Sequence, residues 1–243
     1  MKKLIAMLLA LAMVLSMAAC GGKDNSNDTP KNETPVVTPG QTEAPVSQEQ
    51  EAVQTPSFGE IDEETLRGCA ETPASEFTYV MSINYEGIMI EAYNGTSDVV
   101  VIPAVIDGQP VVEVADYIFA NDSTVRGVVF PETVANLGEV FVNSTCIELV
   151  IAEGVQSIQQ VCFVNCSALR EVILGDGLTK IGILAFSTCA ALEKVYIPAS
   201  LTELSGDEKN TLFFMCTNLT VYGEAGSYIE SVATEKGIPF VAE

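Results

Sequence analysis

The chain has 243 residues, 48% of them hydrophobic, and its 33 Asp and Glu against 11 Lys and Arg give a formal net charge of −22. This acidity argues against nucleic acid as a partner, because Lys and Arg are the residues that bind a phosphate backbone. The chain contains no His, which removes imidazole acid/base catalysis, His-dependent triads and nearly all catalytic zinc sites. We therefore expect no metal and no cofactor.

Residues 1–19 have the pattern of a secretory signal peptide. Two lysines precede an apolar run over residues 4–17, which is too short for a comfortable membrane span. The run leads into Ala18-Ala19-Cys20, which resembles a bacterial lipoprotein signal, in which the Cys is lipidated. We predict Cys20 as the lipidation site and contact with the membrane through that lipid. The alternative is an ordinary cleaved signal with an incidental cysteine.

Residues 20–58 are predicted to be a lipidated Cys followed by a disordered tether. The stretch is rich in Pro, Asn, Thr, Gln and Glu and contains few large apolar residues, so it cannot repay the entropy of folding. As a flexible coil of about 5–6 Å × √n, the tether would set the folded part roughly 35 Å from the membrane.

Residues 59–98 are predicted to form an N-terminal cap. Residues 61–69 either form a short helical turn or stay irregular. Residues 77–83 and 88–93 are β-like runs separated by Asn84-Tyr85-Glu86-Gly87, which is typical of a hairpin. The residues that follow repeat, and a repeat array needs an atypical first unit as a cover. The hairpin provides it.

Residues 99–219 contain a repeated Phe-x-x-Cys-x-x-Leu spacing. It is complete at Phe163, Phe186 and Phe213, and it is present in weaker form at Phe119 and Phe141. From one Leu-type position to the next the steps are 22, 22, 23 and 27 residues. Such a period indicates a solenoid, in which each unit buries its apolar face only against its neighbours.

Each unit is predicted to begin with an extended triplet, to continue with an apolar pair three residues apart, and to end in the Phe turn. The triplets begin at residues 100, 128, 149, 172 and 195. The fold class is therefore a solenoid with about five units and short parallel β-strands on one face. The last repeat carries an insertion, residues 205–211, which is expected to bulge as a polar loop.

Residues 220–243 are predicted to be a C-terminal helical cap. A short helix is expected from residues 226–228 to Lys236, with Gly237 as its stop signal and residues 238–240 as a final extended piece.

At these residues the chain resembles the BspA-like class of bacterial leucine-rich repeats, over about residues 77–243. The third full unit fits that pattern best, at Leu169, Val172, Leu174, Leu178, Ile181, Gly182, Ala185, Phe186 and Cys189. Members of the family include surface adhesins, multidomain secreted proteins and small lipoproteins. The resemblance thus implies the fold without fixing one function.

One face of the predicted strands is the candidate ligand-binding face. The middle residue of each triplet should point out of the solenoid. These residues are Val101, Val129, Val150, Ile173 and Tyr196, and the charged residues Glu148, Glu171 and Lys194 flank them. They would make an apolar stripe on the order of 20 Å long, which is typical of a protein-binding surface. The alternative is that strand faces simply favour β-branched residues and that a cap or tether covers some of them.

The repeated cysteines Cys166, Cys189 and Cys216 invite a disulfide or metal interpretation in an exported protein. Asp122 and Ser144 occupy the same slot in the first two units, which favours a small residue that bonds the turn backbone. We therefore predict free, buried thiols. The redox state stays open for all six cysteines of the predicted folded part, Cys69, Cys146, Cys162, Cys166, Cys189 and Cys216.

Together these features predict an exported leucine-rich-repeat protein that is lipid-anchored to a bacterial cell membrane and faces outward. Its expected activity is protein binding or adhesion, with an extracellular or envelope protein as ligand. One alternative is a structural or accessory module of a cell-envelope assembly, without an extracellular ligand of its own. An enzyme that uses carboxylates alone is weaker, because no paired acids that would converge on one pocket are evident.

Overall fold

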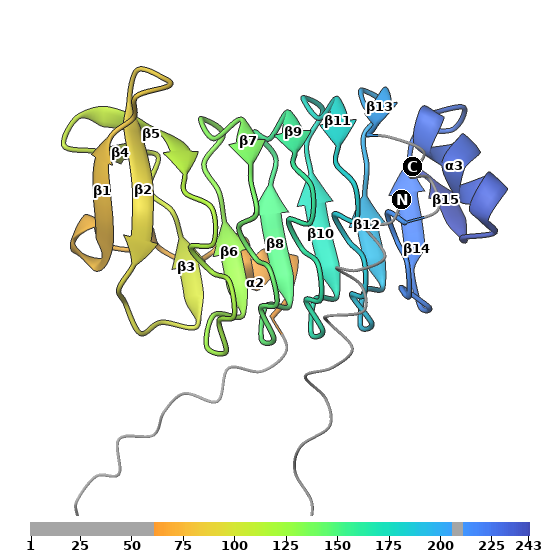
Figure 1. Ribbon diagram of the computed structural model, residues 1–243, viewed down its shortest axis with the longest axis horizontal. Coiled ribbons are helices and arrows are strands. Elements are labelled where there is room, and N and C mark those ends of the chain that lie inside the picture. Colours follow the sequence, from red (N-terminus) through yellow and green to blue (C-terminus); the bar gives the residue numbers. More distant parts are fainter. Residues whose placement is uncertain (1–60, 206–210) are drawn as a thin grey trace, which may run out of the picture. The chain divides into compact units, whose positions relative to one another are not determined.

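The computed structural model describes residues 61–205 and 211–243. The predicted signal peptide, Cys20, the tether and most of the predicted polar loop of the last repeat lie outside the described residues. Within the described part the chain winds into a row of stacked coils (Figure 1). The predicted leucine-rich-repeat solenoid is confirmed.

One long sheet runs along the row of coils, and we call it the main sheet. All its neighbouring strands are parallel, in the order β15-β14-β12-β10-β8-β6-β3. Its strands are β3 (Val99–Val101), β6 (Gly127–Val129), β8 (Leu149–Ala152), β10 (Glu171–Leu174), β12 (Lys194–Tyr196), β14 (Thr220–Gly223) and β15 (Phe240–Ala242). The last two strands belong to the predicted C-terminal cap, so the sheet extends beyond the five predicted units.

A second parallel sheet closes the coils on another side. It consists of the two-residue strands β7 (Asn136–Leu137), β9 (Ser157–Ile158), β11 (Lys180–Ile181) and β13 (Glu203–Leu204). The second residue of each strand is the second member of the predicted apolar pair, and Leu137, Ile158 and Ile181 are fully buried.

The main sheet sends one valine of every coil into the core. Val100, Val128, Val150, Val172, Val195 and Val221 are partners in the parallel register and are all fully buried. Neighbouring coils therefore place the same residue at the same height, and the core is a stack of near-identical layers.

The repeat phenylalanines form a column along the middle of the solenoid. Rings of successive coils lie 5.4, 5.1, 5.1 and 5.6 Å apart, with interplanar angles of 23° or less. The members of the column are Phe119, Phe141, Phe163, Phe186 and Phe213. At the N-terminal end Tyr93 continues it, 6.1 Å from Phe119. Such stacked aromatic pairs stabilise beyond the area that they bury.

The turn after each Phe depends on a residue in the left-handed conformation. The residue two places after the Phe has φ between 56° and 64° in every coil, and it is Asn in the first three. Asn tolerates this conformation better than most side chains. The side chain in the next place then joins one coil to the previous one. The thiols of Cys166, Cys189 and Cys216 donate to the carbonyl of the Phe one coil back, at 3.0–3.1 Å.

The N-terminal end is covered by a small sheet in the order β1-β2-β5-β4. After the short 3-10 helix Ala74–Glu76, strands β1 (Phe77–Met81) and β2 (Ile88–Tyr93) pair antiparallel, as the predicted hairpin requires. Strand β2 also pairs in parallel with β5 (Gln109–Val114), which pairs antiparallel with β4 (Val105–Ile106). This second pairing continues the hairpin into the first coil.

Helix α3 (Tyr228–Lys236) covers the C-terminal end (Figure 1). Ser227 caps it by accepting a hydrogen bond from the Glu230 amide, and Gly237 ends it with φ 66°. Both are residues that favour those positions. Ile229, Val232 and Ala233 are buried. The predicted helix and its stop are thus present.

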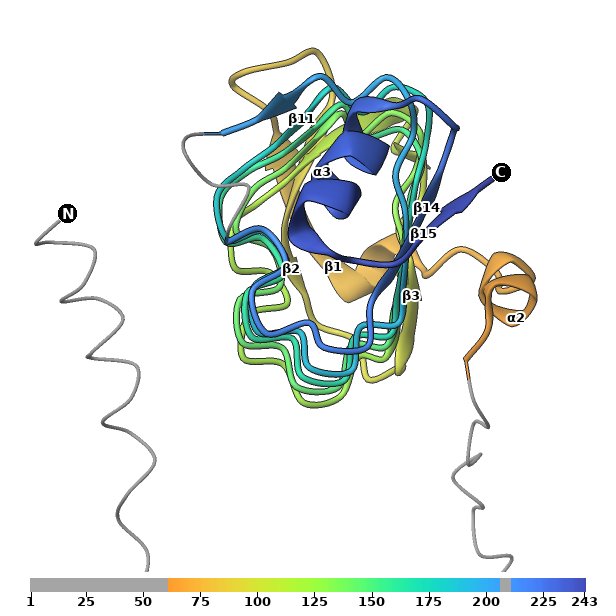
Figure 2. The ribbon, with the colours of Figure 1, turned by 90° about the vertical axis from the view of Figure 1, so that its right-hand side faces the viewer.

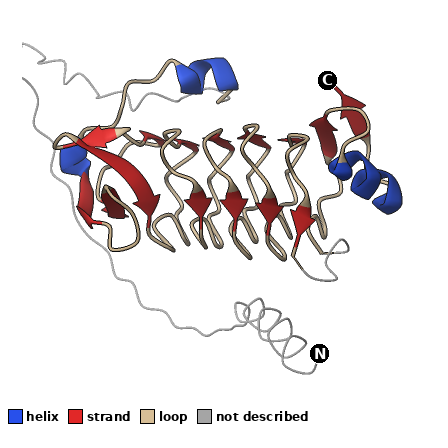
Figure 3. Cartoon of the chain, turned by 90° about the horizontal axis from the view of Figure 1, so that it is seen from above, coloured by secondary structure: helices blue, strands red, loops and turns tan. Residues whose placement is uncertain are grey.

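Helix α2 (Glu63–Arg67) lies apart from both ends. Asp62 caps it by accepting from the Thr65 amide at 2.8 Å, and acidic residues open it while Arg67 closes it, which suits the helix dipole. Viewed along the row of coils, α2 lies outside the wall that the main sheet forms (Figure 2). From above it stands beside the coils, whereas α3 stands at their end (Figure 3). The open choice for residues 61–69 therefore resolves as a helix.

None of the helices in the described residues is both long and apolar enough to cross a membrane.

Candidate binding face

The outer side of the main sheet carries one residue from each strand at the same height. In register, these outward residues are Val101, Val129, Ile151, Ile173, Tyr196, Tyr222 and Val241. We call this row the outer stripe. It contains four of the five residues predicted for the candidate ligand-binding face.

For the fifth residue, Val150, the prediction that it points outward is wrong. It is fully buried and pairs with Val128 and Val172, so it points into the core, and its neighbour Ile151 takes the outward place. The run Leu149–Ala152 is apolar throughout, so alternation alone allows either phase. The sequence does contain a signal for the correct phase. In the first four coils the inward strand residue stands nine places after the repeat Phe, as in Phe163 to Val172 and Phe141 to Val150.

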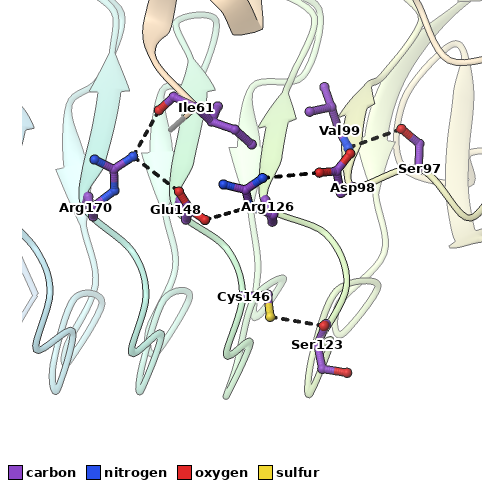
Figure 4. Close-up of polar contacts among 9 residues, drawn as sticks. All are labelled: Ile61, Ser97, Asp98, Val99, Ser123, Arg126, Cys146, Glu148 and Arg170. Carbon is purple, nitrogen blue, oxygen red and sulfur yellow. Dashed lines mark hydrogen bonds and ion pairs between the residues drawn. The ribbon is translucent and has the colours of Figure 1, made fainter. Parts of the chain in front are cut away.

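The same shift removes Glu148 from the flank of the stripe. Leu149 stands level with Glu171 in the register, and Glu171 is level with Lys194. Glu148 instead belongs to a row of alternating charge at the starts of the strands (Figure 4). Its carboxylate accepts from Arg126 at 2.7 Å and from Arg170 at 3.2 Å, and Arg126 also reaches Asp98 at 3.5 Å. This row joins four successive coils.

The middle of the outer stripe is covered by the start of the described chain. Residues 61–72, which we call the N-terminal arm, bring Ile61 and Leu66 onto the sheet, where they form a cluster with Leu149, Ile151 and Ile173. Leu66 is 0% exposed and Ile173 only 8%. The alternative that a segment of the chain covers part of the predicted face is thus correct for β8 and β10.

Polar contacts fix the arm at three points. Arg67 forms a two-pronged ion pair with Glu153, at 2.8 and 3.0 Å, and this contact lowers the pKa of the Glu153 carboxyl. Arg170 donates to the carbonyl of Ile61 at 3.1 Å. At the other end of the arm, Thr72 exchanges two hydrogen bonds with the backbone of Val101. The arm therefore crosses the sheet from β10 to β3.

Beyond the arm, the stripe continues with two tyrosines. The rings of Tyr196 and Tyr222 stack at 5.0 Å and both side chains are partly exposed. The arm and β12 enclose a hollow of about 520 Å³ lined by Asp62, Glu63, Glu64, Arg67, Glu171, Lys194 and Tyr196. Three residues of the predicted face, Glu171, Lys194 and Tyr196, thus gather in one place.

Electrostatics in the hollow are set by partial burial. Removal from water raises the pKa of the Glu171 carboxyl, which Lys194 partly offsets. Burial, followed by the nearby carboxylates of Glu171 and Glu243, raises the pKa of Tyr196. Glu171 is therefore partly withdrawn from water and stands level with Lys194 on the neighbouring strand.

The repeats of the chain match those of a known protein family. The model of the BspA type leucine rich repeat region matches residues 101–220 with six copies. The structure of a leucine-rich repeat protein from T. pallidum is 30% identical, with a TM-score of 0.56, and the match covers 63% of this chain and 71% of that one. The chain belongs to the BspA-type leucine-rich-repeat family.

Two further solved structures share the fold of this BspA-type protein. A leucine rich cell surface protein from Faecalibacterium prausnitzii is 22% identical, with a TM-score of 0.50, over 65% of this chain and 46% of that one. A leucine-rich repeat protein from Bacteroides ovatus is 23% identical, with a TM-score of 0.50, over 63% of this chain and 47% of that one. No curated protein matches the chain.

The repeated cysteines of this BspA-type solenoid serve the turns. The six described cysteines are free. Asp122 accepts from the Thr124 and Val125 amides, and Ser144 donates to the Asp122 carbonyl, so the same slot bonds backbone in the first two coils too. Contact with Cys166 raises the pKa of Cys189, and contact with Cys189 raises that of Cys216. A raised pKa disfavours the thiolate, which is the reactive and metal-binding form.

Proposed function

We propose that this protein binds another protein through the uncovered end of its main sheet, where Tyr196 and Tyr222 stack beside Glu171 and Lys194. The observation that carries the proposal is this partly exposed aromatic pair with charged neighbours. Tyrosine is enriched at the residues that dominate binding energy, because it buries a large ring and keeps a polar group at its tip.

Binding is favoured over catalysis by the chemistry of the hollow. Lys194 and Arg67 stand among its carboxylates, so opposite charges neighbour each other instead of two acids facing one reacting atom. Such a mixed rim beside an aromatic patch orients a protein partner and steers its approach.

The proposed location is the outside of a bacterial cell. The signal-like residues 1–19, the lipidation site Cys20 and the tether composition of residues 20–58 support export and lipid anchoring. The F. prausnitzii structure, which shares the fold, is of a cell surface protein. Adhesion to a host or neighbouring-cell protein is the role that combines these features.

The test compares the full-length protein with a variant that carries Tyr196→Asp and Tyr222→Asp. Both proteins are displayed on native cells, chemically crosslinked to added extracellular proteins, and the captured partners are quantified. We expect the double variant to capture at least tenfold less partner than the wild-type protein does. A matched control is Val105→Asp, which adds a charge at an exposed position of the N-terminal cap. Equal capture by the double variant and the control would contradict the proposal.

A further inference from the structure

The arm lies in a shallow socket on the outer side of the main sheet, over strands β6, β8 and β10. Leu66 sits over Gly127 of β6, where a Cβ would come within 2.9 Å of the leucine side chain. Gly127 is itself buried, and Leu149 is its partner in the register. A glycine in a strand often marks a place where another group approaches closely. Here the approaching group is Leu66.

The arm is held like a bound peptide. Its apolar contacts form a cluster separate from the main core of the solenoid. Helix α2 is not paired with any strand. Residues 61–67 are held by the ion pair of Arg67 with Glu153 and by the hydrogen bond that Arg170 donates to the Ile61 carbonyl. If residues 61–67 left this socket, only contacts that involve a side chain would break, and every layer of the coils would stay intact.

We propose that the socket on β6, β8 and β10 is a peptide-binding site, and that residues 61–67 are its resident occupant. The partner that competes for it is a short segment of another protein with the same chemistry: an aliphatic residue, a second aliphatic residue five places later, and an arginine immediately after it. The inference deepens the proposed function, on which it rests for the existence of a protein partner. It adds that part of the sheet is closed until such a segment displaces the arm.

The chemistry of the competing segment follows from the contacts. The first aliphatic residue replaces Ile61 in the apolar cluster on the sheet, and the second replaces Leu66 over Gly127. The arginine meets Glu153 with two parallel hydrogen bonds, a geometry that lysine cannot reproduce. Size, shape and charge of the segment are thus all specified by the socket.

The experiment uses the arm itself as the probe. A labelled peptide with the sequence of residues 59–72, with Ser in place of Cys69, is titrated against the full-length protein in a non-ionic detergent. Wild-type protein holds its own arm, so its site is filled. The Leu66→Asp variant cannot bury its arm and is expected to bind the peptide at least tenfold more tightly than wild type does.

Two matched changes test the chemistry of the contact. The Leu66→Asp protein, whose arm has left the socket, is called the arm-released protein below. A peptide with Leu66→Asp should not bind it. Adding Glu153→Lys to that protein should abolish binding of the wild-type peptide, and a peptide with Arg67→Glu should restore it at least in part. This charge exchange distinguishes specific binding in the socket from non-specific adsorption to the exposed sheet.

The outcomes are decisive in each direction. A folded Leu66→Asp protein that fails to bind the peptide overturns the proposal, as does equal binding of both peptides. If the wild-type protein exchanges arms between two copies and becomes a dimer, the occupant is a second copy and the proposal is wrong. Hydrogen exchange of the wild-type protein gives a second measurement, in which the arm amides must exchange faster than those of β8. Arm exchange that occurs only with global unfolding overturns the proposal.

The proposed function can fail separately. Tyr196→Asp with Tyr222→Asp leaves the socket untouched, so peptide binding by the arm-released protein should persist. Equal partner capture by the double tyrosine variant and the Val105→Asp control, with intact peptide binding, would contradict the proposed function alone. Reduced capture by the double variant, with no peptide binding by the arm-released protein, would contradict only the socket.

Discussion

At the scale of single residues, the phenylalanine column contains the largest fully buried side chains of the described chain. Phe163 is 0% exposed and stacks on both neighbours at 5.1 Å. We expect Phe163→Ala to lower the free energy of unfolding by about 3–5 kcal/mol, because it removes a buried ring and leaves a cavity between two others. Chemical denaturation followed by circular dichroism measures this loss.

Phe214 provides the control for that prediction. It stands one place after a column residue and is 49% exposed. Phe214→Ala should change the free energy of unfolding by less than about 0.5 kcal/mol. Equal losses for Phe163→Ala and Phe214→Ala would mean that the column contributes nothing beyond ordinary surface contacts.

Glu171 gives a prediction with the opposite sign. Its raised pKa means that the folded state binds a proton more readily than the unfolded state, so its ionised form costs stability as pH rises above 4.5. Glu171→Gln should therefore stabilise the protein at pH 7, by less than about 1 kcal/mol because the group is partly solvated. The gain should vanish below about pH 4. Glu132→Gln, on the exposed surface, is the control, and thermal unfolding at both pH values is the measurement. A destabilised Glu171→Gln protein at pH 7 would refute the interpretation.

The sequence determines most of the residue-scale packing. Repeated Phe spacing predicts the column, and the slot shared by Asp122, Ser144 and Cys166 predicts backbone bonding in the turn. The phase of β8 was missed because four consecutive apolar residues satisfy both faces of a strand. Counting from the Phe, instead of from the apolar run, gives the correct phase there.

At the scale of elements, the arm should respond to acid. The hydrogen bonds from Arg67 lower the pKa of Glu153, so the pair contributes to docking above the ordinary Glu value of 4.5 and is lost as pH falls through the lower, folded value. Protonation of Asp62, whose pKa the Thr65 amide lowers, weakens the helix cap as pH falls below 3.8. Protection of the arm amides against hydrogen exchange should thus stay constant from pH 7 to about 5 and drop about two- to fivefold below about pH 4.

Glu153→Gln separates the two contributions to that response. It removes the charged partner of Arg67 and leaves the Asp62 cap, so arm protection at pH 7 should be lower and its change with pH smaller. If Glu153→Gln and wild type show the same pH profile, the ion pair does not hold the arm.

Element positions were predictable only where local signals suffice. Ser227, Gly237 and the hairpin turn mark helix α3 and strands β1 and β2 directly in the sequence. Helix α2 has a local cap in Asp62, but its place on the sheet depends on Glu153 and Arg170, which are 86 and 109 residues away from their partners in the arm. No short-range pattern encodes such a contact. The uncovered end of the candidate face was therefore predictable, and the covered middle was not.

At the scale of the whole molecule, a solenoid depends on its ends. Ile229 of helix α3 is fully buried against the last coil, and Ile229→Asp would place a charge there. We expect hydrogen exchange to accelerate first in β14 and β12, while β3 and β6 keep their protection, because each coil is stabilised mainly by its neighbours. Thr234→Asp, on the exposed side of the same helix, should leave the pattern unchanged. Uniform acceleration across the main sheet would show that the coils unfold as one unit.

The side-on attachment of the arm also decides how the molecule would bear a pull. Sixty residues precede the arm, and tension arriving through them would load Ile61 and Arg170 first, then peel the arm from β10 toward β3 until Thr72 is reached. Residues 61–72 would yield at most about 40 Å of extra length before any coil is strained. We expect single-molecule stretching to show this short, low-force extension before the coils unravel, and to show it no longer in Leu66→Asp. The arm would then extend under a small load and limit the force on the coils, which would stay folded.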